Sequence, residues 1–341
     1  MKGASNMKRT LSIILAILIL ATAAAPALAE GVKIGWYAPG TNQYTETVHI
    51  GVEAFMADYP DADVKVIFGD TEQTNMDNNV RALVADGYNN ISTFPCTEGA
   101  AGLYSDIATF GVRVAGWGAS TSAQTELLAV ASDVEAAAYT ATEEAIKGMG
   151  GSGGILNVLE VLGDTNTLKR RDGVNACIEA YADQGVTLVQ EVGDINNIEE
   201  GVTKISAALS ANEGEIDAIV CTGTMTSSAA TQVLYDYYAR NPEADKIVLV
   251  CLDTADDVMK GIEDGIVYGT IAQNTFAHGY VPCAALYLME TEGLVPAEDT
   301  FLIDSRCVLV TQDNIDTYED ELTEVTQQIV ADLSGTYLVA P

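Results

Sequence analysis

The stretch that decides the fold is "IDAIVCTGTMTSSAATQVLYDYYARNPEADKIVLVCLD", residues 216–253. It begins with one apolar run, "IDAIVCT" (216–222), and ends with a second, "KIVLVCLD" (246–253). The residues between them, 226–239, are expected to form a helix. A strand, a helix and a strand in this order predict two parallel strands of one sheet joined by a right-handed crossover.

The same alternation extends over most of the chain, with a glycine-rich break, "GMGGSGG" (148–154), near its middle. Before the break, strands are expected at 32–38, 62–69, 90–94 and 112–117, with helices at 45–59, 75–86, 99–109 and 133–147. After it, further strands are expected at 155–162, 186–192, 267–273 and 305–311, with helices at 170–183, 198–212, 255–264 and 277–292. The predicted fold class is therefore α/β, with two doubly wound parallel-sheet domains joined by a hinge. In such sheets ligands bind beyond the carboxyl ends of the strands, so a cleft between the domains is the expected site.

The N-terminus has the pattern of an export signal. Lys8 and Arg9 precede an almost unbroken apolar run (11–25), and Ala27-Leu28-Ala29 offers small residues for cleavage after Ala29. A membrane anchor is the alternative, but the run is shorter than the roughly 20 apolar residues of a spanning helix. No cysteine precedes Cys96, so no lipid anchor is expected. Residues 1–29 are predicted to be a cleaved signal peptide, and the remainder to be periplasmic.

Composition excludes several classes of function. A formal net charge of −33 disfavours binding to nucleic acid or to an anionic membrane. The six cysteines form no C-x-x-C pair, so buried thiols are expected, although Cys221 and Cys251 could be bridged if their strands are neighbours. His49 and His278 stand alone, which predicts no metal site.

One nucleotide-binding motif is misleading. Gly148, Gly150 and Gly153 satisfy G-x-G-x-x-G, yet they precede a strand, whereas a dinucleotide loop follows a strand and begins a helix. The chain has no G-K-[ST] phosphate loop and no H-E-x-x-H. We therefore expect no cofactor and no enzymatic activity.

Seven segments together carry a resemblance to a known family over about residues 31 to 330. They are Asn42-Gln43-Tyr44, "TFPCTE" (93–98), "VASD" (130–133), "RRDG" (170–173), "VLVCLD" (248–253), "TIAQ" (270–273) and "VTQDNIDTY" (310–318). In order and spacing the chain resembles the type I periplasmic solute-binding proteins of sugar ABC transporters, in the ribose- and galactose-binding group. The resemblance implies an N-terminal lobe of 31–132 plus 274–302 and a C-terminal lobe of 133–273 plus 303–333. It also implies a monomeric receptor that closes on a small neutral ligand, a sugar or related polyol, and docks on an ABC permease.

The residue types at the matching positions suit a sugar. A carboxylate such as Asp253 accepts hydrogen bonds from two hydroxyl groups, the guanidinium of Arg170 donates two, and Gln273 does both. Aromatic rings cover the apolar faces of a sugar. Tyr44 matches the stacking aromatic residue of the family, and Trp117 stands at the end of strand 112–117, on the same rim. The candidate ligand contacts are Asn42, Tyr44, Trp117, Asn166, Arg170, Asp253 and Gln273. Each also has a structural alternative, namely helix capping, surface pairing or core packing.

Three departures from the family pattern leave the ligand open. Gly223-Thr224 stands where relatives often have Asn-Asp, Trp117 stands where the ribose group has Asp, and Ile195 replaces an aromatic residue. A different sugar, a polyol or a less polar molecule is therefore expected. The alternatives are an exported carbohydrate-active enzyme, a ligand-presenting sensor for a chemoreceptor, and a regulator of the lac-repressor type. The last would need an N-terminal helix-turn-helix and a basic face.

Overall fold

The computed structural model describes residues 31–341. The predicted signal peptide and its cleavage site lie outside this range. Across residues 31–341, no helix combines the length and the apolar character that a membrane crossing requires.

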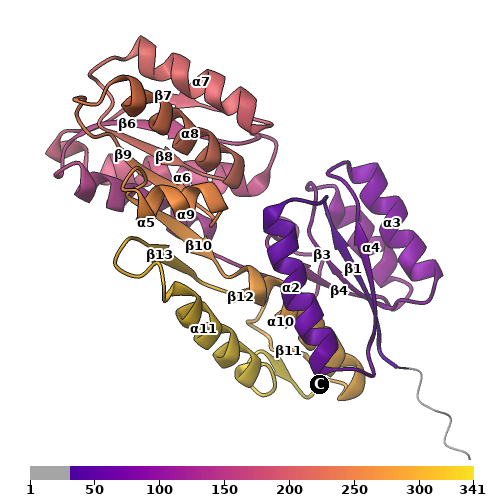
Figure 1. Ribbon diagram of the computed structural model, residues 1–341. Coiled ribbons are helices and arrows are strands. Elements are labelled where there is room, and N and C mark those ends of the chain that lie inside the picture. The colour runs from indigo at the N-terminus through magenta and orange to yellow at the C-terminus, as the bar shows by residue number, and fades with distance from the viewer. Residues whose placement is uncertain (1–30) are drawn as a thin grey trace, which may run out of the picture. The chain divides into compact units, whose positions relative to one another are not determined.

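Two six-stranded sheets organise the chain, and the first has the order β12-β5-β4-β3-β1-β2 (Figure 1). All its neighbouring strands are parallel. Its interior strands read as nearly continuous apolar runs because helices cover a parallel sheet on both faces. The strands are β1 (Lys33–Ala38), β2 (Asp63–Phe68), β3 (Asn90–Thr93), β4 (Arg113–Trp117), β5 (Leu128–Ala131) and β12 (Leu302–Asp304). The accompanying helices are α2 (Gln43–Asp58), α3 (Gln73–Ala85), α4 (Ala100–Ala108) and α10 (Thr275–Thr291).

The second sheet has the order β13-β10-β9-β8-β6-β7. Its strands are β6 (Gly153–Val158), β7 (Val186–Val192), β8 (Ala218–Cys221), β9 (Val248–Leu252), β10 (Gly269–Gln273) and β13 (Cys307–Val310). Its helices are α5 (Val134–Gly148), α6 (Thr165–Ala180), η2 (Ala182–Gln184), α7 (Ile198–Ala211), α8 (Thr224–Arg240), α9 (Asp256–Glu263) and α11 (Tyr318–Asp332). A further pair, β11 (Val295–Pro296) and β14 (Leu338–Val339), is antiparallel. The predicted pair of α/β domains is thus confirmed, with one difference: β13 runs antiparallel to β10 at the sheet edge.

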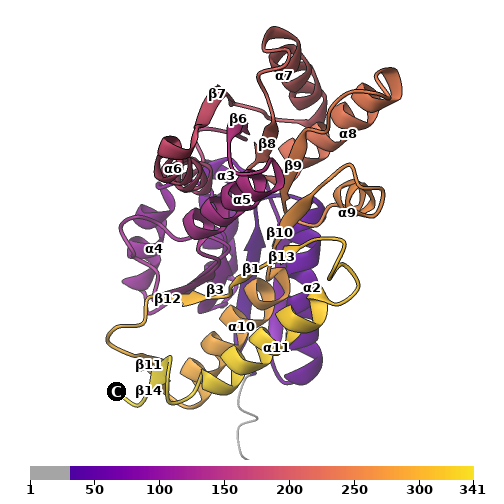
Figure 2. The ribbon, with the colours of Figure 1, turned by 90° about the vertical axis from the view of Figure 1, so that its left-hand side faces the viewer.

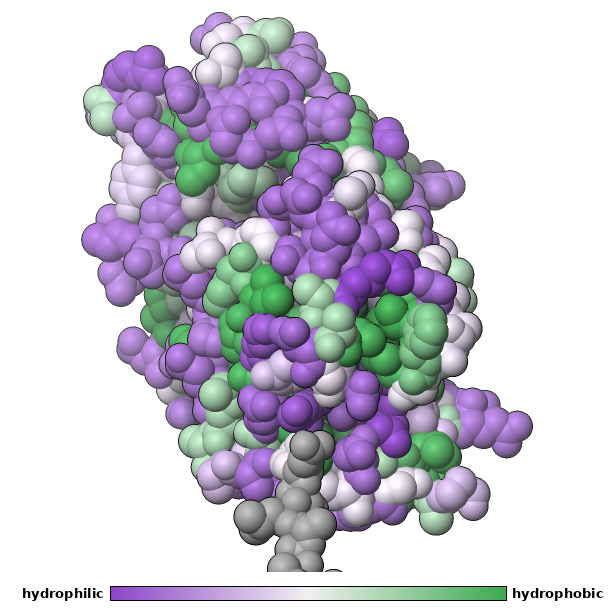
Figure 3. All heavy atoms as spheres, turned by 90° about the vertical axis from the view of Figure 1, so that its right-hand side faces the viewer, coloured by the Kyte–Doolittle hydropathy of each residue, from purple (hydrophilic) through white to green (hydrophobic). Residues whose placement is uncertain are grey.

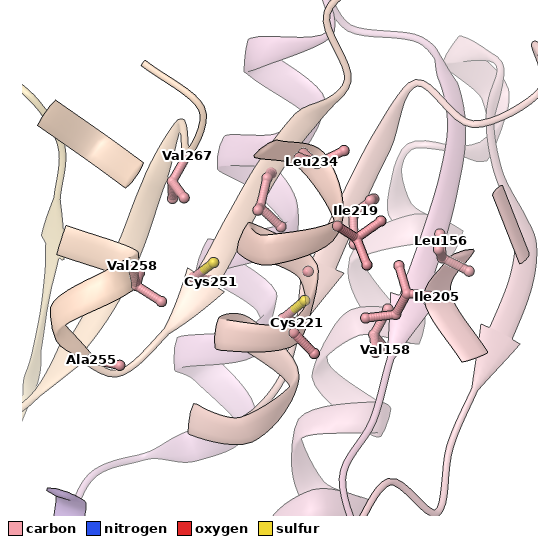
Figure 4. Packing of buried hydrophobic residues seen from close by; sticks show 14 of the residues in the cluster. Leu156, Val158, Ile205, Ile219, Cys221, Leu234, Cys251, Ala255, Val258 and Val267 are labelled. Carbon is pink, nitrogen blue, oxygen red and sulfur yellow. The ribbon is translucent and has the colours of Figure 1, made fainter. Parts of the chain in front are cut away.

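The core of the second domain contains the two cysteines that could have formed a bridge. Val220 pairs with Val250, so Cys221 and Cys251 follow at the next register position, and Figure 4 shows both sulfur atoms among aliphatic side chains. Both are free thiols and are buried. Burial raises the pKa of the Cys251 thiol to about 12, so it stays protonated. The two residues therefore act as small apolar side chains of the core.

Glycines bring α2 and α10 into direct backbone contact, and the two helices lie side by side in Figures 1 and 2. A Cβ atom at Gly279 would lie 2.0 Å from the carbonyl oxygen of Val48, and one at Gly51 would lie 2.2 Å from that of Phe276. Only glycine allows such an approach. This packing places the first turn of α2 against the first turn of α10, where the candidate site begins.

The chain passes from one sheet to the other at three places. They lie between β5 and α5, between β10 and α10, and between β12 and β13. Ser132 lies in the first crossing, and Ser305 and Arg306 lie in the third. Because β12 extends to Asp304 in the first sheet, the third crossing falls at residues 304–307.

Polar side chains cover much of the face shown in Figure 3, and apolar ones form separate patches between them. This agrees with the acidic composition.

Candidate functional site

Asp253 is the centre of the candidate site. It follows directly after β9 and has a φ of 68°, in the left-handed region that non-glycine residues rarely adopt. Two bonds to β10 hold it there: its N–H donates to the carbonyl of Ile271 at 2.9 Å, and its carbonyl accepts from Oγ1 of Thr270 at 2.7 Å. Backbone strain of this kind is concentrated at functional sites.

Two neighbours orient the carboxylate of Asp253. Oγ1 of Thr224 donates to Oδ2 at 2.5 Å, and Nε2 of Gln273 donates to Oδ1 at 2.7 Å. Gln273 is only 6% exposed, and its Oε1 has no hydrogen-bond partner within residues 31–341. A buried acceptor without a partner costs free energy, so this atom is available to a ligand.

A small cavity of about 20 Å³ adjoins these groups. It is lined by Gln43, Tyr44, Thr47, Thr224, Asp253, Thr254, Ala255, Gln273 and Thr275. The lining therefore comes from α2 and α10 of the first domain and from the strand ends of the second. In this conformation the space holds about one water molecule.

Tyr44 enters the site from the first turn of α2. Its hydroxyl lies 3.0 Å from Nδ1 of His278, on α10. Burial raises the pKa of Tyr44, so the phenol stays protonated. His278 is fully buried, and burial lowers its pKa to about 3, so the ring is neutral at pH 7.

Arg170 lies deep on α6 and is 7% exposed. Its Nη1 donates to the carbonyl of Thr222 at 3.1 Å, whereas its Nε has no acceptor in the described part of the chain. The guanidinium is close enough to lower the pKa of both Tyr44 and Glu160, although burial raises each of them more. Arg170 thus supplies the positive charge near a largely acidic site.

Glu160 is a buried acid beside the site, near Arg170 and Asp253, that the sequence analysis missed. It follows β6, and its Oε1 accepts from the N–H of Met225 at 2.8 Å. Burial raises the pKa of its carboxyl to about 7, against the opposing effect of Arg170. A Cβ at Gly223 would lie 2.2 Å from Cδ of Glu160, so the unusual glycine leaves room for this carboxyl group. In the sequence, Gly223-Thr224 in place of the usual Asn-Asp was the feature that could have indicated both Glu160 and Thr224.

Asn166 and two further residues link the two domains directly. Nδ2 of Asn166 donates to the carbonyl of Gly118 at 3.1 Å. Two more hydrogen bonds of this kind run from Thr165 to Glu98 at 3.1 Å and from Gln43 to Asp256 at 3.2 Å. The amide donor of Asn166 is therefore engaged with the opposite domain.

Two predicted contacts occupy other positions. Trp117 is 0% exposed; it stacks on Trp36 with the ring centroids 5.2 Å apart, and its Nε1 donates to the carbonyl of Tyr37 at 3.2 Å. In this conformation the indole is therefore buried in the first domain, with one face on Trp36, rather than on an open rim. Asn42 is exposed and caps α2, where Oδ1 accepts from the N–H of Thr45 at 2.9 Å.

The structure therefore brings Tyr44, Asp253 and Gln273 to one cavity and places Arg170 near it. No group of His, Cys, Asp or Glu side chains in residues 31–341 has the arrangement of a metal site.

Comparison with known proteins agrees with this geometry. Residues 35–292 match the family described as periplasmic binding protein domain. No curated protein matches the chain. A solute-binding protein of an ABC transporter from Burkholderia graminis, in complex with D-arabinose, superimposes with a TM-score of 0.76 at 19% identity, covering 85% of this chain and 98% of that one.

Two more solved structures have the same fold. A Bacillus halodurans ABC transporter solute-binding protein with bound myo-inositol has a TM-score of 0.76 at 18% identity, covering 86% of this chain and 100% of that chain. An Agrobacterium vitis protein with bound D-fucose has a TM-score of 0.73 at 18% identity, covering 85% and 99%. With a family match over most of its length and a cavity lined by both of its α/β domains, the chain belongs to the periplasmic binding proteins.

Proposed function

We propose that this protein is the extracytoplasmic receptor of an ABC importer and that it binds a small neutral sugar or polyol in the cavity around Asp253. The main support for the proposal is a pair of polar groups in a cavity that residues of both domains line. These are the carboxylate of Asp253, held in a strained backbone conformation, and the buried, unpartnered Oε1 of Gln273.

The chemistry of these groups fits a polyhydroxylated ligand. Asp253 and Gln273 accept hydrogen bonds from hydroxyl groups, and the free Nε of Arg170 donates one. The ligands named for the similar solved structures, D-arabinose, myo-inositol and D-fucose, are neutral and rich in hydroxyl groups. Asn42 and Asn166 remain candidate contacts only if their present hydrogen bonds are exchanged, and Trp117 lies behind Tyr44, with the ring centroids 6.5 Å apart.

Ligand entry requires the cavity to widen, because its volume of about 20 Å³ is far below that of a sugar. We propose that the lobes 31–132 plus 274–302 and 133–273 plus 303–333 separate and close again about the three crossings. The hydrogen bonds of Asn166, Thr165 and Gln43 to the opposite domain would break on opening. A ligand that contacts both lobes shifts this equilibrium toward the closed form.

The biological setting follows from the same proposal. The signal peptide directs the chain out of the cytoplasm, the mature form is a monomer, and the closed receptor docks on a membrane permease. It acts as a receptor rather than as an enzyme, so the ligand should be recovered unchanged.

Thermal denaturation against a panel of sugars and polyols tests the proposal. The panel includes D-arabinose, myo-inositol and D-fucose. A ligand at 100 times its dissociation constant adds about 2.7 kcal/mol of stability. Asp253→Asn should abolish that stabilisation, whereas Asp245→Asn, the same change at an exposed position, should leave it intact. Equal stabilisation of both variants, or conversion of a panel compound into a product, would overturn the proposal.

A further inference from the structure

A line of buried polar side chains connects Tyr44 with the two crossings that hold the serines. The hydroxyl of Tyr44 lies 3.0 Å from Nδ1 of His278, and Nε2 of His278 lies 2.7 Å from Oγ of Ser305. Oγ of Ser305 lies 3.0 Å from Oγ of Ser132, which donates to the carbonyl of Arg306 at 3.2 Å. His278, Ser305 and Ser132 are all at most 5% exposed. We call Tyr44, His278, Ser305 and Ser132 the relay.

We assign the directions of these hydrogen bonds from the end of the relay at Ser132. The carbonyl of Arg306 can only accept, and with Ser132 donating to it the single hydroxyl proton of Ser132 is used there. Ser305 must then donate to Ser132, and it can only accept from His278. Nε2 of His278 therefore carries the proton of the ring.

Since the buried imidazole is neutral, its other nitrogen has a lone pair. Nδ1 accepts, and within residues 31–341 the donor facing it is the hydroxyl of Tyr44. The phenol proton of Tyr44 is thus directed away from the cavity and toward α10.

We infer that His278 is a positioning residue that leaves the hydroxyl of Tyr44 only as a hydrogen-bond acceptor toward the ligand. Two neighbouring groups, Asp253 and Gln273, have the same polarity. Nε2 of Gln273 and the hydroxyl of Thr224 both donate to Asp253, so Gln273 offers Oε1 and Asp253 offers its carboxylate. The ligand must present donors to Tyr44, Asp253 and Gln273, either hydroxyl protons or an amine, and a carbonyl, carboxylate or phosphate group is disfavoured next to them.

This inference rests on the proposed function for its ligand, but the state of His278 can be measured without any ligand. The protein has two histidines, so selective ¹⁵N labelling gives a simple imidazole spectrum, and His49→Gln assigns the remaining ring to His278. At pH 7 we expect a protonated Nε2 and an unprotonated Nδ1 in the full-length folded protein. A proton on Nδ1, or a doubly protonated ring, would overturn the inference.

A variant tests whether the relay is the cause. Ser132→Ala removes the acceptor of the Ser305 hydroxyl, so Ser305 becomes free to donate to His278 and part of the population should move its proton to Nδ1. An unchanged His278 spectrum in the folded variant would show that the crossing does not control the tautomer, and the inference would fail.

The ligand requirement has its own readout, with D-arabinose as the probe. A fluorine in place of a hydroxyl group can accept but cannot donate. For one of its monofluoro-deoxy analogues we expect a loss of about tenfold in affinity in the wild type, which disappears in Tyr44→Phe. Retained affinity of every analogue would refute the donor requirement. If no sugar of the panel binds, the proposed function fails, and the tautomer measurement still decides the relay.

Discussion

Replacing Glu160 by glutamine should change how the stability of the protein depends on pH. The residue is partly exposed as a whole, but its carboxyl group lies deep beside Arg170 and the start of α8. Burial raises its pKa from an ordinary 4.5 to about 7. The folded protein therefore retains a proton that the unfolded chain releases between pH 4.5 and pH 7.

The sign follows from linkage. Because the folded state binds more protons in this window, the contribution of Glu160 to the free energy of unfolding is greatest below pH 4.5 and falls as the pH rises through about 7. Each pKa unit corresponds to about 1.4 kcal/mol, so the full difference is about 3 kcal/mol. With some solvent screening of the carboxyl group, we expect about 2–3 kcal/mol.

Denaturant unfolding of the wild type and of Glu160→Gln between pH 4.5 and pH 8 measures this effect. Glutamine keeps an oxygen for the N–H of Met225 and has no charge, so the variant should gain about 2–3 kcal/mol relative to the wild type between these limits. Glu298→Gln, at an exposed position, serves as the matched control and should show no such trend. A stability difference between Glu160→Gln and wild type that does not vary with pH would refute the reasoning.

Three further predictions concern packing and the site. Gly279→Ala should destabilise the protein by several kcal/mol, because the new Cβ would lie 2.0 Å from a carbonyl oxygen of α2. Gly102→Ala, the same change at an open helical position, should stabilise the protein by about 0.5–1 kcal/mol. Equal melting temperatures of the two variants would contradict this. Thr224→Val removes the hydroxyl that orients Asp253, so it should leave the fold intact and weaken ligand binding about tenfold in calorimetry. Thr224→Ser keeps a hydroxyl group and should restore the affinity. Trp117→Phe should remove the paired-indole signal from the near-ultraviolet circular dichroism spectrum, since Trp117 and Trp36 stack with an interplanar angle of 7°; an unaltered spectrum would argue against the stack.

Much of the fold was predictable from local pattern. The apolar runs of β1, β8 and β9 and the helices between strands carry their periodicity in consecutive residues, so their identity needs no knowledge of distant contacts. The short strands β5 and β12 were not predicted as strands, because segments of three or four residues carry too little pattern. The sequence also did not predict that β13 runs antiparallel to β10, because strand direction depends on the path of the chain between the sheets.

The candidate site, too, was predictable from the sequence only in part. Asp253 and Gln273 stand at the ends of apolar runs, and parallel strands bring their carboxyl ends to one edge of a sheet, so the sequence alone determined that these two side chains would be near each other. The tertiary structure decided the rest. Tyr44 meets His278 only because glycines let α2 and α10 touch, and Glu160 enters the site only because Gly223 leaves space for it. Such contacts join positions far apart in the chain, and they depend on the packing of side chains, which no local pattern records.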